Sequence, residues 1–498
     1  MSSISIQHLN FRYDDSQSLL FDDVSLSLDT SWKLGIIGRN GCGKTTFLNL
    51  LLGNLDYQGE ITSPVSFEYF PYEVSHPEKK VGEVLGEIAP EAEDWQKEYE
   101  LSCLGMNPEI LERDFEVCSG GEKQRILLAG MFLKEGSFPL IDEPTNHLDE
   151  EAKEAVANYL SLKKGFILVS HDRILLDRVA DHILYFGRGK IEIQKGNFSS
   201  WKENKDKRDA FEISENEKRK KEIKKLDEAA KQSSTWSLDA EKGKYNTTNS
   251  GSKIDRGYVG HKAAKLMQRS KNIERRKENC IEEKKALLQD VDDLEELKMA
   301  PCNPGRTQLG SLDQVQVLYD GKPIFEPVSF QIQAGDRIAI TGGNGAGKSS
   351  LLKLILGEPL SYRGEFQRTN AIRLSYVPQQ TDSLKGTWKE LCQTRGLEEI
   401  PFSSALARMG LTFKDFSKRL EQLSEGQKKK VLLAASFLTP ADLYLWDEPL
   451  NYVDIQTRMQ LETMLKEAKP TLIFVDHDKA FRDEIATKVI DVKRLGSK

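Results

Sequence analysis

The chain has 498 residues, of which 38% are hydrophobic and 30% are charged, and its formal net charge at pH 7 is −7. This length allows two or three domains, and the composition excludes a mainly disordered chain. The net negative charge by itself argues against a nucleic-acid partner. The distribution of charge along the chain is more informative on that point.

The sequence shows no feature of secretion or membrane insertion. The first residues, "MSSISIQHLN", lack both the basic start and the apolar centre of a signal peptide. No apolar run approaches the ~20 residues that a membrane-spanning helix requires. The six cysteines follow no metal-binding spacing and indicate neither a disulfide framework nor a zinc site. We therefore expect a cytoplasmic protein without a membrane partner.

Two glycine-rich stretches fit the pattern of a phosphate-binding loop, or P-loop. They are "GRNGCGKT" at 38–45 and "GGNGAGKS" at 342–349, each between an apolar strand and a leucine-rich helix. In such a loop the glycines let backbone N–H groups wrap a phosphate chain, the lysine reaches the terminal phosphates and the hydroxyl binds Mg²⁺. The residues that we expect to bind nucleotide here are Gly38, Asn40, Gly41, Gly43, Lys44, Thr45, Thr46, Gly342, Asn344, Gly345, Gly347, Lys348, Ser349 and Ser350.

The two P-loops belong to a larger internal repeat. "SFPLIDEPTNHLD" at 137–149 matches "DLYLWDEPLNYVD" at 442–454, and "FILVSHD" at 166–172 matches "LIFVDHD" at 472–478. Because their order and spacing agree, we predict two copies of one α/β domain. The predicted boundaries are 1–201 and 306–498.

The acids of the repeat predict catalytic chemistry. Asp142 and Asp447 end apolar strands, where a carboxylate can join Thr45 or Ser349 in the Mg²⁺ shell. Glu143 and Glu448 come next and are placed to orient or activate the attacking water. A purely structural acid at a strand end is the alternative, but the repeat of "DEP" in both halves argues against it.

Two histidines occupy matching places after another apolar strand. His171 and His477 are among only seven histidines in the chain. A lone histidine is usually structural, but two in equivalent positions favour contact with the γ-phosphate in each half.

The segment at 202–305 has a different composition. It is rich in charge and lacks proline from 202 to 300, and its second part repeats apolar residues at a seven-residue step, at Leu266, Ile273, Cys280, Leu287 and Leu294. That step predicts one seam of a coiled coil. A polar loop precedes this second part, and we expect it to form the tip, near 242–258, of a hairpin of two antiparallel helices; an arm of about forty residues per helix would extend about 60 Å.

The outer end of this predicted hairpin is basic. From 253 to 277 there are nine basic residues against two acids, although the chain is acidic overall. A solvated helix face and a rigid spacer are the simpler interpretations, but a basic cluster beside a polar loop favours contact with RNA phosphates. The candidates are Lys242, Lys244, Lys253, Arg256, Tyr258, Lys262, Lys265 and Arg269. Tyr258 would stack on a base, or be an exposed tyrosine without that role.

"CSGGEKQR" at 118–125 and "LSEGQKKK" at 423–430 complete the motif set. P-loop, "SGG" signature, "DEP" and a switch histidine, in that order, resemble the ATP-binding cassette domains. The two repeats are therefore called the first cassette (1–201) and the second cassette (306–498). The resemblance implies head-to-tail pairing of the cassettes within a monomer, with two ATP and two Mg²⁺ per chain. It adds nucleotide contacts at Ser119, Gly120, Gly121, Ser424 and Gly426, adenine stacking on Tyr13 and Tyr319, and a Mg²⁺-arranging Gln379.

Three kinds of cassette protein remain possible. A transporter ATPase needs separate membrane partners and no helical hairpin, and the DNA-repair type carries zinc modules or longer coiled coils. The ABC-F family combines twin cassettes with a helical hairpin that enters the ribosome. "DEPTNHLD" at 142–149 and "GNFSSW" at 196–201 are similar to ABC-F motifs, and only about 46 residues separate Tyr72 from Ser119, which leaves no room for an inserted arm.

That combination resembles the antibiotic-resistance branch of ABC-F proteins, and the Lsa-like subgroup in particular. The resemblance implies a protein that protects the 70S ribosome against lincosamides, pleuromutilins and streptogramins A. With ATP bound, the hairpin would lie in the E site, its tip acting near the peptidyl-transferase centre through 23S rRNA and the P-site tRNA. Hydrolysis would then release the protein. A housekeeping translation factor of the same family remains the alternative.

Two departures from the family pattern fall at one predicted ATP site. The second signature has Glu425 in place of a glycine, and the first cassette has Tyr72 where the second has Gln379. Head-to-tail pairing brings both to P-loop 38–45. Because a carboxylate repels an anionic phosphate, we expect this site to hydrolyse ATP more slowly than the site at P-loop 342–349.

Overall fold

The computed structural model describes most of both cassettes and a small part of the segment between them. The described residues are 2–14, 19–134, 136–146, 148–187, 191–212, 214–215, 218, 221, 265, 268, 272, 275–276, 297–299, 301–302, 305, 307–369 and 372–495. They form two compact units, Met1–Ser199 together with Leu294–Lys498, and Ser200–Asp293. The predicted seven-residue seam and the predicted tip lie outside the described residues.

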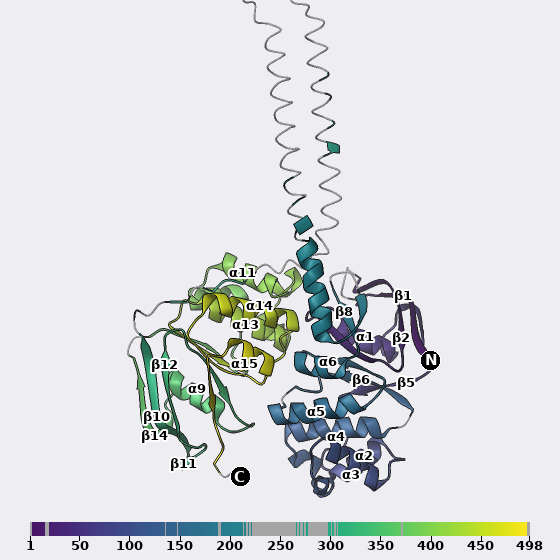
Figure 1. Ribbon diagram of the computed structural model, residues 1–498, viewed down its shortest axis with the longest axis horizontal. Helices are drawn as coiled ribbons and strands as arrows, with labels where there is room; N and C mark the ends of the chain where they lie inside the picture. The colour runs from purple at the N-terminus through teal and green to yellow at the C-terminus, as the bar shows by residue number, and fades with distance from the viewer. Residues whose placement is uncertain are drawn as a thin grey trace, which may run out of the picture. The chain divides into compact units, whose positions relative to one another are not determined.

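The first cassette alternates strands and helices (Figure 1). Its elements are β1 (Ser3–Phe11), β2 (Phe21–Asp29), β3 (Lys33–Gly38), α1 (Lys44–Leu51), β4 (Gln58–Thr62), β5 (Ser66–Phe70), α2 (Val81–Ile88), α3 (Asp94–Cys103), η1 (Pro108–Glu112), η2 (Phe115–Val117), α4 (Gly120–Leu133), β6 (Ser137–Asp142), α5 (Glu150–Leu162), β7 (Phe166–Val169), α6 (Arg173–Val179), β8 (His182–Phe186) and β9 (Ile191–Lys195).

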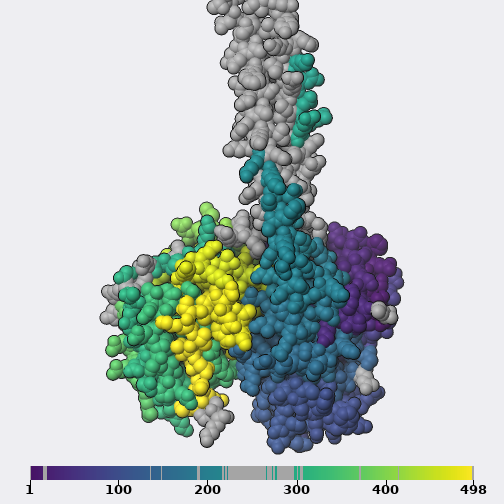
Figure 2. Space-filling view, in the orientation of Figure 1, coloured from purple at the N-terminus to yellow at the C-terminus, as the bar shows by residue number. Residues whose placement is uncertain are grey.

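The second cassette repeats this plan. Its elements are β10 (Gln308–Tyr319), β11 (Lys322–Pro323), β12 (Val328–Gln333), β13 (Arg337–Thr341), α9 (Lys348–Leu356), β14 (Ser361–Arg368), β15 (Leu374–Val377), α10 (Trp388–Arg395), α11 (Glu399–Arg408), α12 (Phe413–Phe416), η3 (Leu420–Gln422), α13 (Glu425–Leu438), β16 (Leu443–Asp447), α14 (Ile455–Ala468), β17 (Leu472–Val475), α15 (Lys479–Ile485) and β18 (Lys488–Asp491). Figure 2 shows the end of the chain, in yellow, as a strip on the surface of this cassette.

Each cassette contains a central, mainly parallel sheet and a smaller antiparallel one. The central sheets have the strand orders β5-β6-β7-β3-β8-β9, with β9 antiparallel to β8, and β15-β16-β17-β13-β18. The small sheets are β2-β1-β4 and β11-β10-β12, with β14 also paired to β10. The predicted α/β fold with two P-loop cassettes is confirmed.

The order of the parallel strands brings the predicted site residues together. In the first cassette, Asp142 at the end of β6 pairs with Val169 of β7, and Ile36 of β3 pairs with the same residue from the other side. In the second cassette, Asp447 pairs with Val475 in the same way. Because the carboxyl ends of parallel strands meet at one edge, P-loop, acids and histidine share that edge.

Apolar packing holds these sheets and helices in place. The strand β16, "LYLWD", is buried along its whole length, as expected of a central parallel strand covered on both faces. On one face of the second sheet, β10, β12 and α9 enclose a core that includes Leu312, Val315 and Leu351; Figure 1 shows α9 beside β10 and β14. On the other face α13 and α14 pack against Trp446.

Much of the described part of the linker is helical, whereas residues 297–299 and 301–302 have no regular secondary structure. Residues 198–212 form one helix, and Lys265, Gln268, Asn272, Arg275 and Arg276 are helical and exposed. Within the described residues, no helix is both long and apolar enough to cross a membrane.

Candidate functional site

Both P-loops take the conformation that the glycine pattern requires. Gly41 and Gly345 have φ values of 80° and 73°, and among the described residues nothing lies within 4 Å of where a Cβ would stand on either. A Cβ on Gly43 would stand 2.9 Å from Phe21, and one on Gly347 would stand 2.8 Å from Phe325. Only glycine fits these positions without strain.

The P-loop lysines are buried and held by their own loops. Lys44 Nζ donates to Gly38 O at 2.9 Å and Arg39 O at 3.0 Å. Lys348 Nζ donates to Gly342 O at 2.8 Å and to Gly343 O at 2.9 Å. Each ammonium is thus fixed at the mouth of a loop whose N–H groups start a helix, where an anion is favoured.

The predicted Mg²⁺ ligands lie together in both cassettes. Thr45 Oγ1 donates to Asp142 Oδ2 at 2.9 Å, and Ser349 Oγ donates to Asp447 Oδ1 at 3.1 Å. Burial raises the pKa of both aspartates, that of Asp447 to about 6. A hydroxyl–carboxylate pair beside a P-loop is the oxygen donor set that Mg²⁺ prefers, so these residues fit the metal.

The glutamates that follow have strained backbones. Glu143 and Glu448 have φ values of 51° and 47°, a region that costs a non-glycine residue about 1–3 kcal/mol and clusters at functional sites. Their N–H groups donate to Val169 O at 2.9 Å and Val475 O at 2.8 Å, and these bonds hold the strained turns in place.

The surroundings of the two glutamates differ. Glu448 accepts from Asn451 Nδ2 at 2.5 Å. Burial opposes its ionisation, but the nearby His477 and Gln379 side chains and the charge of Lys348 outweigh it and lower the pKa to about 2. Glu448 is therefore an ionised base at neutral pH.

Glu143 has weaker contacts. His171 N lies 3.4 Å from Oε2, and Oε1 is buried without a hydrogen-bond partner among the described residues. Burial, and then the charge of Asp142, raise the pKa of Glu143 to about 8. At neutral pH this carboxyl is mostly protonated and cannot accept a proton from water.

The two switch histidines face these glutamates. His171 Nε2 is 3.6 Å from Glu143 Oε1, and His477 Nε2 is 3.7 Å from Glu448 Oε1. Burial, and then the charges of Lys44 and Arg458, lower the pKa of His171, so this ring is neutral.

Tyr13 and Tyr319 are each about half exposed, with an exposed fraction of 48%. Their hydroxyls contact Thr46 Oγ1 at 2.8 Å and Ser350 Oγ at 3.1 Å. In the second cassette the tyrosine lines a cavity of about 540 Å³ that also contains Lys348, Ser349, Gln379, Glu448 and His477. That volume suits a nucleotide-sized ligand, so the residues present fit ATP.

The signature serines start helices. Ser119 Oγ accepts from Glu122 N and caps α4, and Ser424 Oγ accepts from Gln427 N and caps α13. Each forms a capping box with the residue three positions later. These caps fix the backbone conformation of both signature motifs at the start of their helices.

P-loop 38–45 contacts the second cassette. Asn40 Nδ2 donates to Tyr452 O at 2.7 Å, and Arg39 Nε donates to Gln456 Oε1 at 2.6 Å. A Cβ on Gly426 would stand 2.6 Å from Asn40 Nδ2. Tyr452 replaces the histidine of "PTNHLD" and has a φ of 62°; its backbone contacts the first P-loop.

P-loop 342–349 and the signature of the first cassette, at 119–121, contact each other less closely. Burial lowers the pKa of Lys348, and the carboxylates of Glu448 and of Asp149, which belongs to the first cassette, oppose that shift. Gly120 has no described atom within 4 Å of the position of a Cβ, and Gly121 would meet Leu148 of its own cassette.

Glu425 is neutralised within its own cassette. Its Oε1 accepts from Lys428 Nζ at 2.8 Å and its Oε2 from Thr381 Oγ1 at 2.6 Å. These bonds lower its pKa. The repulsion expected from the sequence is therefore smaller than a bare carboxylate would produce, and the difference between Glu143 and Glu448 becomes the stronger reason to expect unequal sites.

Sequence reasoning missed residues that join the switch histidines to the opposite cassette. Lys153 Nζ donates to His477 O at 2.9 Å, and Arg458 Nη1 donates to His171 O at 3.0 Å. These two cations occupy equivalent positions of α5 and α14. The signal available in the sequence was a basic residue at the same place in both repeats.

Most of the predicted RNA contacts cannot be placed. Lys265 is helical and exposed. The others lie outside the described residues: Lys242, Lys244, Lys253, Arg256, Tyr258, Lys262 and Arg269.

Comparison with known proteins agrees with this geometry. The family model described as ABC transporter matches residues 21–146 and 325–451. The energy-dependent translational throttle protein EttA of Escherichia coli (strain K12) is 28% identical over 96% of this chain and 90% of that protein. The ribosome protection protein VmlR of Bacillus subtilis (strain 168) is 28% identical over 98% of this chain and 86% of that protein.

A solved structure shares the fold. The archaeal ribosome recycling factor aABCE1, in its complex with the stalk protein aP1, has a TM-score of 0.63 at 19% identity, over 98% of this chain and 89% of that one. The similarity to EttA and VmlR over nearly the whole chain supports the assignment to ABC-F proteins. The chain therefore belongs to the ABC transporter family as a P-loop ATPase with two ATP-binding cassettes.

Proposed function

We propose that this ATPase is a ribosome-protection protein of the Lsa-like type, which binds the ribosomal E site and uses its linker tip to displace lincosamides, pleuromutilins and streptogramins A. The observation that carries the proposal is the similarity over 98% of the chain, linker included, to a protein named for ribosome protection. The absence of an inserted arm in the sequence of the first cassette supports the same branch.

The cassettes would each hold one ATP and one Mg²⁺. In the second cassette, Lys348 would bind the terminal phosphates, Ser349, Asp447 and Gln379 would hold the metal, and Glu448 would take a proton from water. The first cassette would use Lys44, Thr45 and Asp142 in the same roles, and Glu143 would act as the base only in the fraction of molecules in which it is ionised. When bound, Mg²⁺ would neutralise charge on the transferred phosphoryl group. His171 and His477 would contact the γ-phosphate.

The linker would supply the RNA contacts. Lys265, Arg275 and Arg276 are exposed on helix, and basic side chains on a helix neutralise rRNA phosphates with release of counterions. The tip would act on 23S rRNA and the P-site tRNA near the drug. Closure of the cassettes around ATP would keep the linker bound, and hydrolysis would release it.

A protein that sediments with 70S ribosomes only in the presence of ATP is the expected result for the Glu143→Gln, Glu448→Gln variant. Removing both bases stops hydrolysis and keeps the cassettes closed. Binding is expected to weaken as salt rises, and to weaken further when Lys265, Arg275 and Arg276 are all changed to Glu. The measurement is co-sedimentation at two salt concentrations. Absence of binding in every condition would overturn the proposal.

A housekeeping translation factor is the second candidate, since EttA is similar over 96% of the chain and is named a translational throttle protein. Expression in a drug-sensitive bacterium separates the two. Ribosome protection predicts a higher inhibitory concentration for a lincosamide, and loss of that effect in the Glu143→Gln, Glu448→Gln variant. Unchanged sensitivity, with ribosome binding intact, would favour the housekeeping function.

The two exposed tyrosines provide a test of adenine stacking. Tyr319→Ala is expected to weaken ATP binding to the second cassette about tenfold, because stacking of a base on an aromatic ring contributes about 1–3 kcal/mol. Tyr319→Phe keeps the ring and loses only the contact with Ser350, so its affinity should stay within about threefold. Titration with a fluorescent ATP analogue measures both, and the pair Tyr13→Ala and Tyr13→Phe repeats the test in the first cassette. Equal losses for the Ala and Phe variants would exclude stacking.

A further inference from the structure

One lysine of the second signature helix is buried beside the catalytic groups. Lys429 lies on α13, five residues after Ser424, and its exposed fraction is 1%. Its Nζ donates to Pro378 O at 2.8 Å, to Gln379 O at 3.1 Å and to Asp447 O at 3.2 Å. An ammonium has three N–H donors, and backbone carbonyls occupy all three.

These carbonyls belong to the two segments that carry site residues. Gln379 lines the same cavity as Glu448 and helps to lower the pKa of Glu448, and the side chain of Asp447 accepts from Ser349 at 3.1 Å. On the strand side, Lys429 thus binds the residue next to the base, and on the loop side it binds a residue that shares the cavity with the base. Its own contacts are entirely with backbone, so they set where these segments lie relative to each other.

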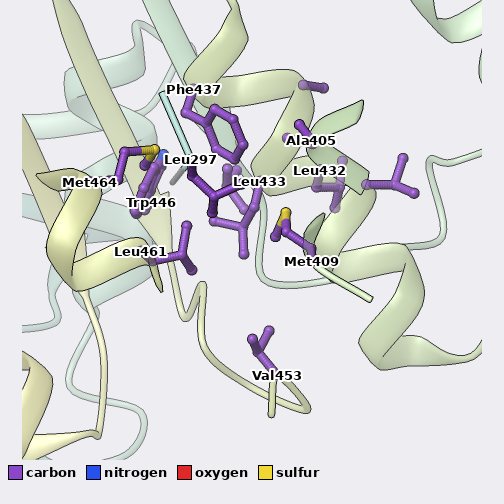
Figure 3. Close-up of a cluster of buried hydrophobic side chains, with 14 of the residues drawn as sticks. Leu297, Ala405, Met409, Leu432, Leu433, Phe437, Trp446, Val453, Leu461 and Met464 are labelled. Carbon is purple, nitrogen blue, oxygen red and sulfur yellow. The ribbon is translucent and has the colours of Figure 1, made fainter. Parts of the chain in front are cut away.

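The helix that carries Lys429 is rigidly packed. Figure 3 shows Leu433 and Phe437 of α13 on the side of Leu297 and Trp446, and Leu432 beside Ala405 and Met409; all belong to one buried cluster. Trp446 Nε1 donates to Ser436 Oγ at 3.0 Å. Close packing of this kind leaves little room for the helix to shift against the strand, so the ammonium is held at a fixed distance from the end of β16.

The surroundings of Lys429 favour its charged form. The carboxylates of Asp447, Asp476 and Glu448 lie near the ammonium, and three backbone carbonyls accept from it. Because a buried charge is costly unless it is fully hydrogen-bonded, the cation favours the one arrangement of the two segments that offers it all three carbonyls.

The first cassette is built differently at this position. Gln124 stands five residues after Ser119. When its amide is oriented so that the nitrogen faces the carbonyls, this nitrogen donates to Pro144 O at 3.1 Å and to Asn146 O at 2.7 Å. The bonds of this neutral side chain go to the segment after Glu143. The loop residue that matches Gln379 is a tyrosine, Tyr72, so the two cassettes differ in both partners of the arrangement.

We propose that Lys429 is a positioning residue for ATP hydrolysis in the second cassette: its ammonium ties the loop of Gln379 to the end of β16 and thereby holds Glu448 in place. The signature helix that starts at Ser424 would then be joined mechanically to the base of its own cassette. The first cassette, with Gln124 and Tyr72, lacks that charged connection.

The test uses the full chain with Glu143→Gln, so that hydrolysis depends on Glu448. In this background Lys429→Met is expected to lower kcat for ATP about tenfold while KM changes less than twofold, because positioning of the base affects the reaction and not the phosphate contacts. Lys429→Gln, which inserts the side chain found in the first cassette and keeps two donors, is expected to give an intermediate kcat. Rates are normalised to the amount of nucleotide bound, so that unfolded protein does not count.

Lys428→Met is the matched control, because it removes the same charge from the neighbouring residue, whose ammonium contacts Glu425. Its kcat should stay within twofold of the background. If Lys429→Met does not fold, Lys429→Gln alone decides. A kcat within twofold of the background in a folded Lys429 variant, or a rise in KM with kcat unchanged, would overturn the proposal, and so would an equal loss in the Lys428 control.

Discussion

Glu448→Gln is expected to slow steady-state ATP hydrolysis about a hundredfold, whereas Glu143→Gln is expected to slow it less than threefold. A general base contributes about 10²–10⁴-fold when it is ionised and correctly placed. Glu448 meets both conditions, since its pKa is lowered to about 2 and Asn451 and Gln379 hold it. Glu143, with a pKa raised to about 8, contributes little at neutral pH. Phosphate release by the purified variants measures both effects.

The pH dependence of the two single variants separates this explanation from a simple difference in affinity. In the Glu448→Gln variant, the remaining hydrolysis depends on Glu143, which loses its proton as pH rises through about 8. Its rate should therefore increase between pH 7 and pH 9. In the Glu143→Gln variant, Glu448 is ionised throughout that range, and the rate should not show this increase. Equal slowing by the two substitutions, or identical pH profiles, would contradict unequal sites.

Asp454→Asn is expected to destabilise the second cassette by about 3–5 kcal/mol, because it leaves a buried lysine without its counter-charge. Asp454 is fully buried, with an exposed fraction of 0%, and its Oδ2 lies 2.5 Å from Lys430 Nζ. Although burial opposes ionisation, the ammonium holds the pKa of Asp454 well below its usual range. The other bond of Lys430, to Met409 O, cannot replace a carboxylate.

The equivalent change in the first cassette is the control. Asp149 and Asp454 cap α5 and α14 in the same way, and asparagine is as good a cap as aspartate. Asp149→Asn should therefore cost less than about 0.5 kcal/mol. The expected cost in the second cassette corresponds to a Tm lowered by about 10 °C, which scanning calorimetry of the two variants measures. Similar shifts for both would show that the ion pair contributes little.

Much of the candidate site was predictable because its motifs specify local backbone. A Gly-x4-Gly-Lys pattern between an apolar strand and a helix requires positive φ values that only glycine adopts at low cost, and Gly41, Gly43, Gly345 and Gly347 have them. Likewise, an acid at the end of an apolar strand reaches the carboxyl edge of a parallel sheet whatever else the fold contains. The hydroxyl–carboxylate pairs at 2.9 Å and 3.1 Å follow from these two local rules.

The inequality of the two sites was predictable only in part. The exchange of Gln379 for Tyr72 is visible in the sequence, and it removes a side chain of the kind that helps to lower the pKa of Glu448. The argument from Glu425 was incomplete, because the bonds of this carboxylate to Lys428 and Thr381 join residues whose proximity depends on how α13 packs. The raised pKa of Glu143 likewise depends on burial, and motif spacing does not report burial.

The run "QKKK" at 427–430 separates what the sequence determines from what depends on the tertiary structure. In the sequence its three lysines cannot be told apart, whereas the order of P-loop, signature, acid and histidine already indicated the family and the ATPase chemistry. In the folded chain Lys428 contacts Glu425, Lys429 binds three backbone carbonyls and Lys430 pairs with Asp454. The physical reason is that successive residues of an α-helix point about 100° apart, so each lysine meets a different neighbour, and those neighbours come from segments that only the packing of the sheet and helices brings together.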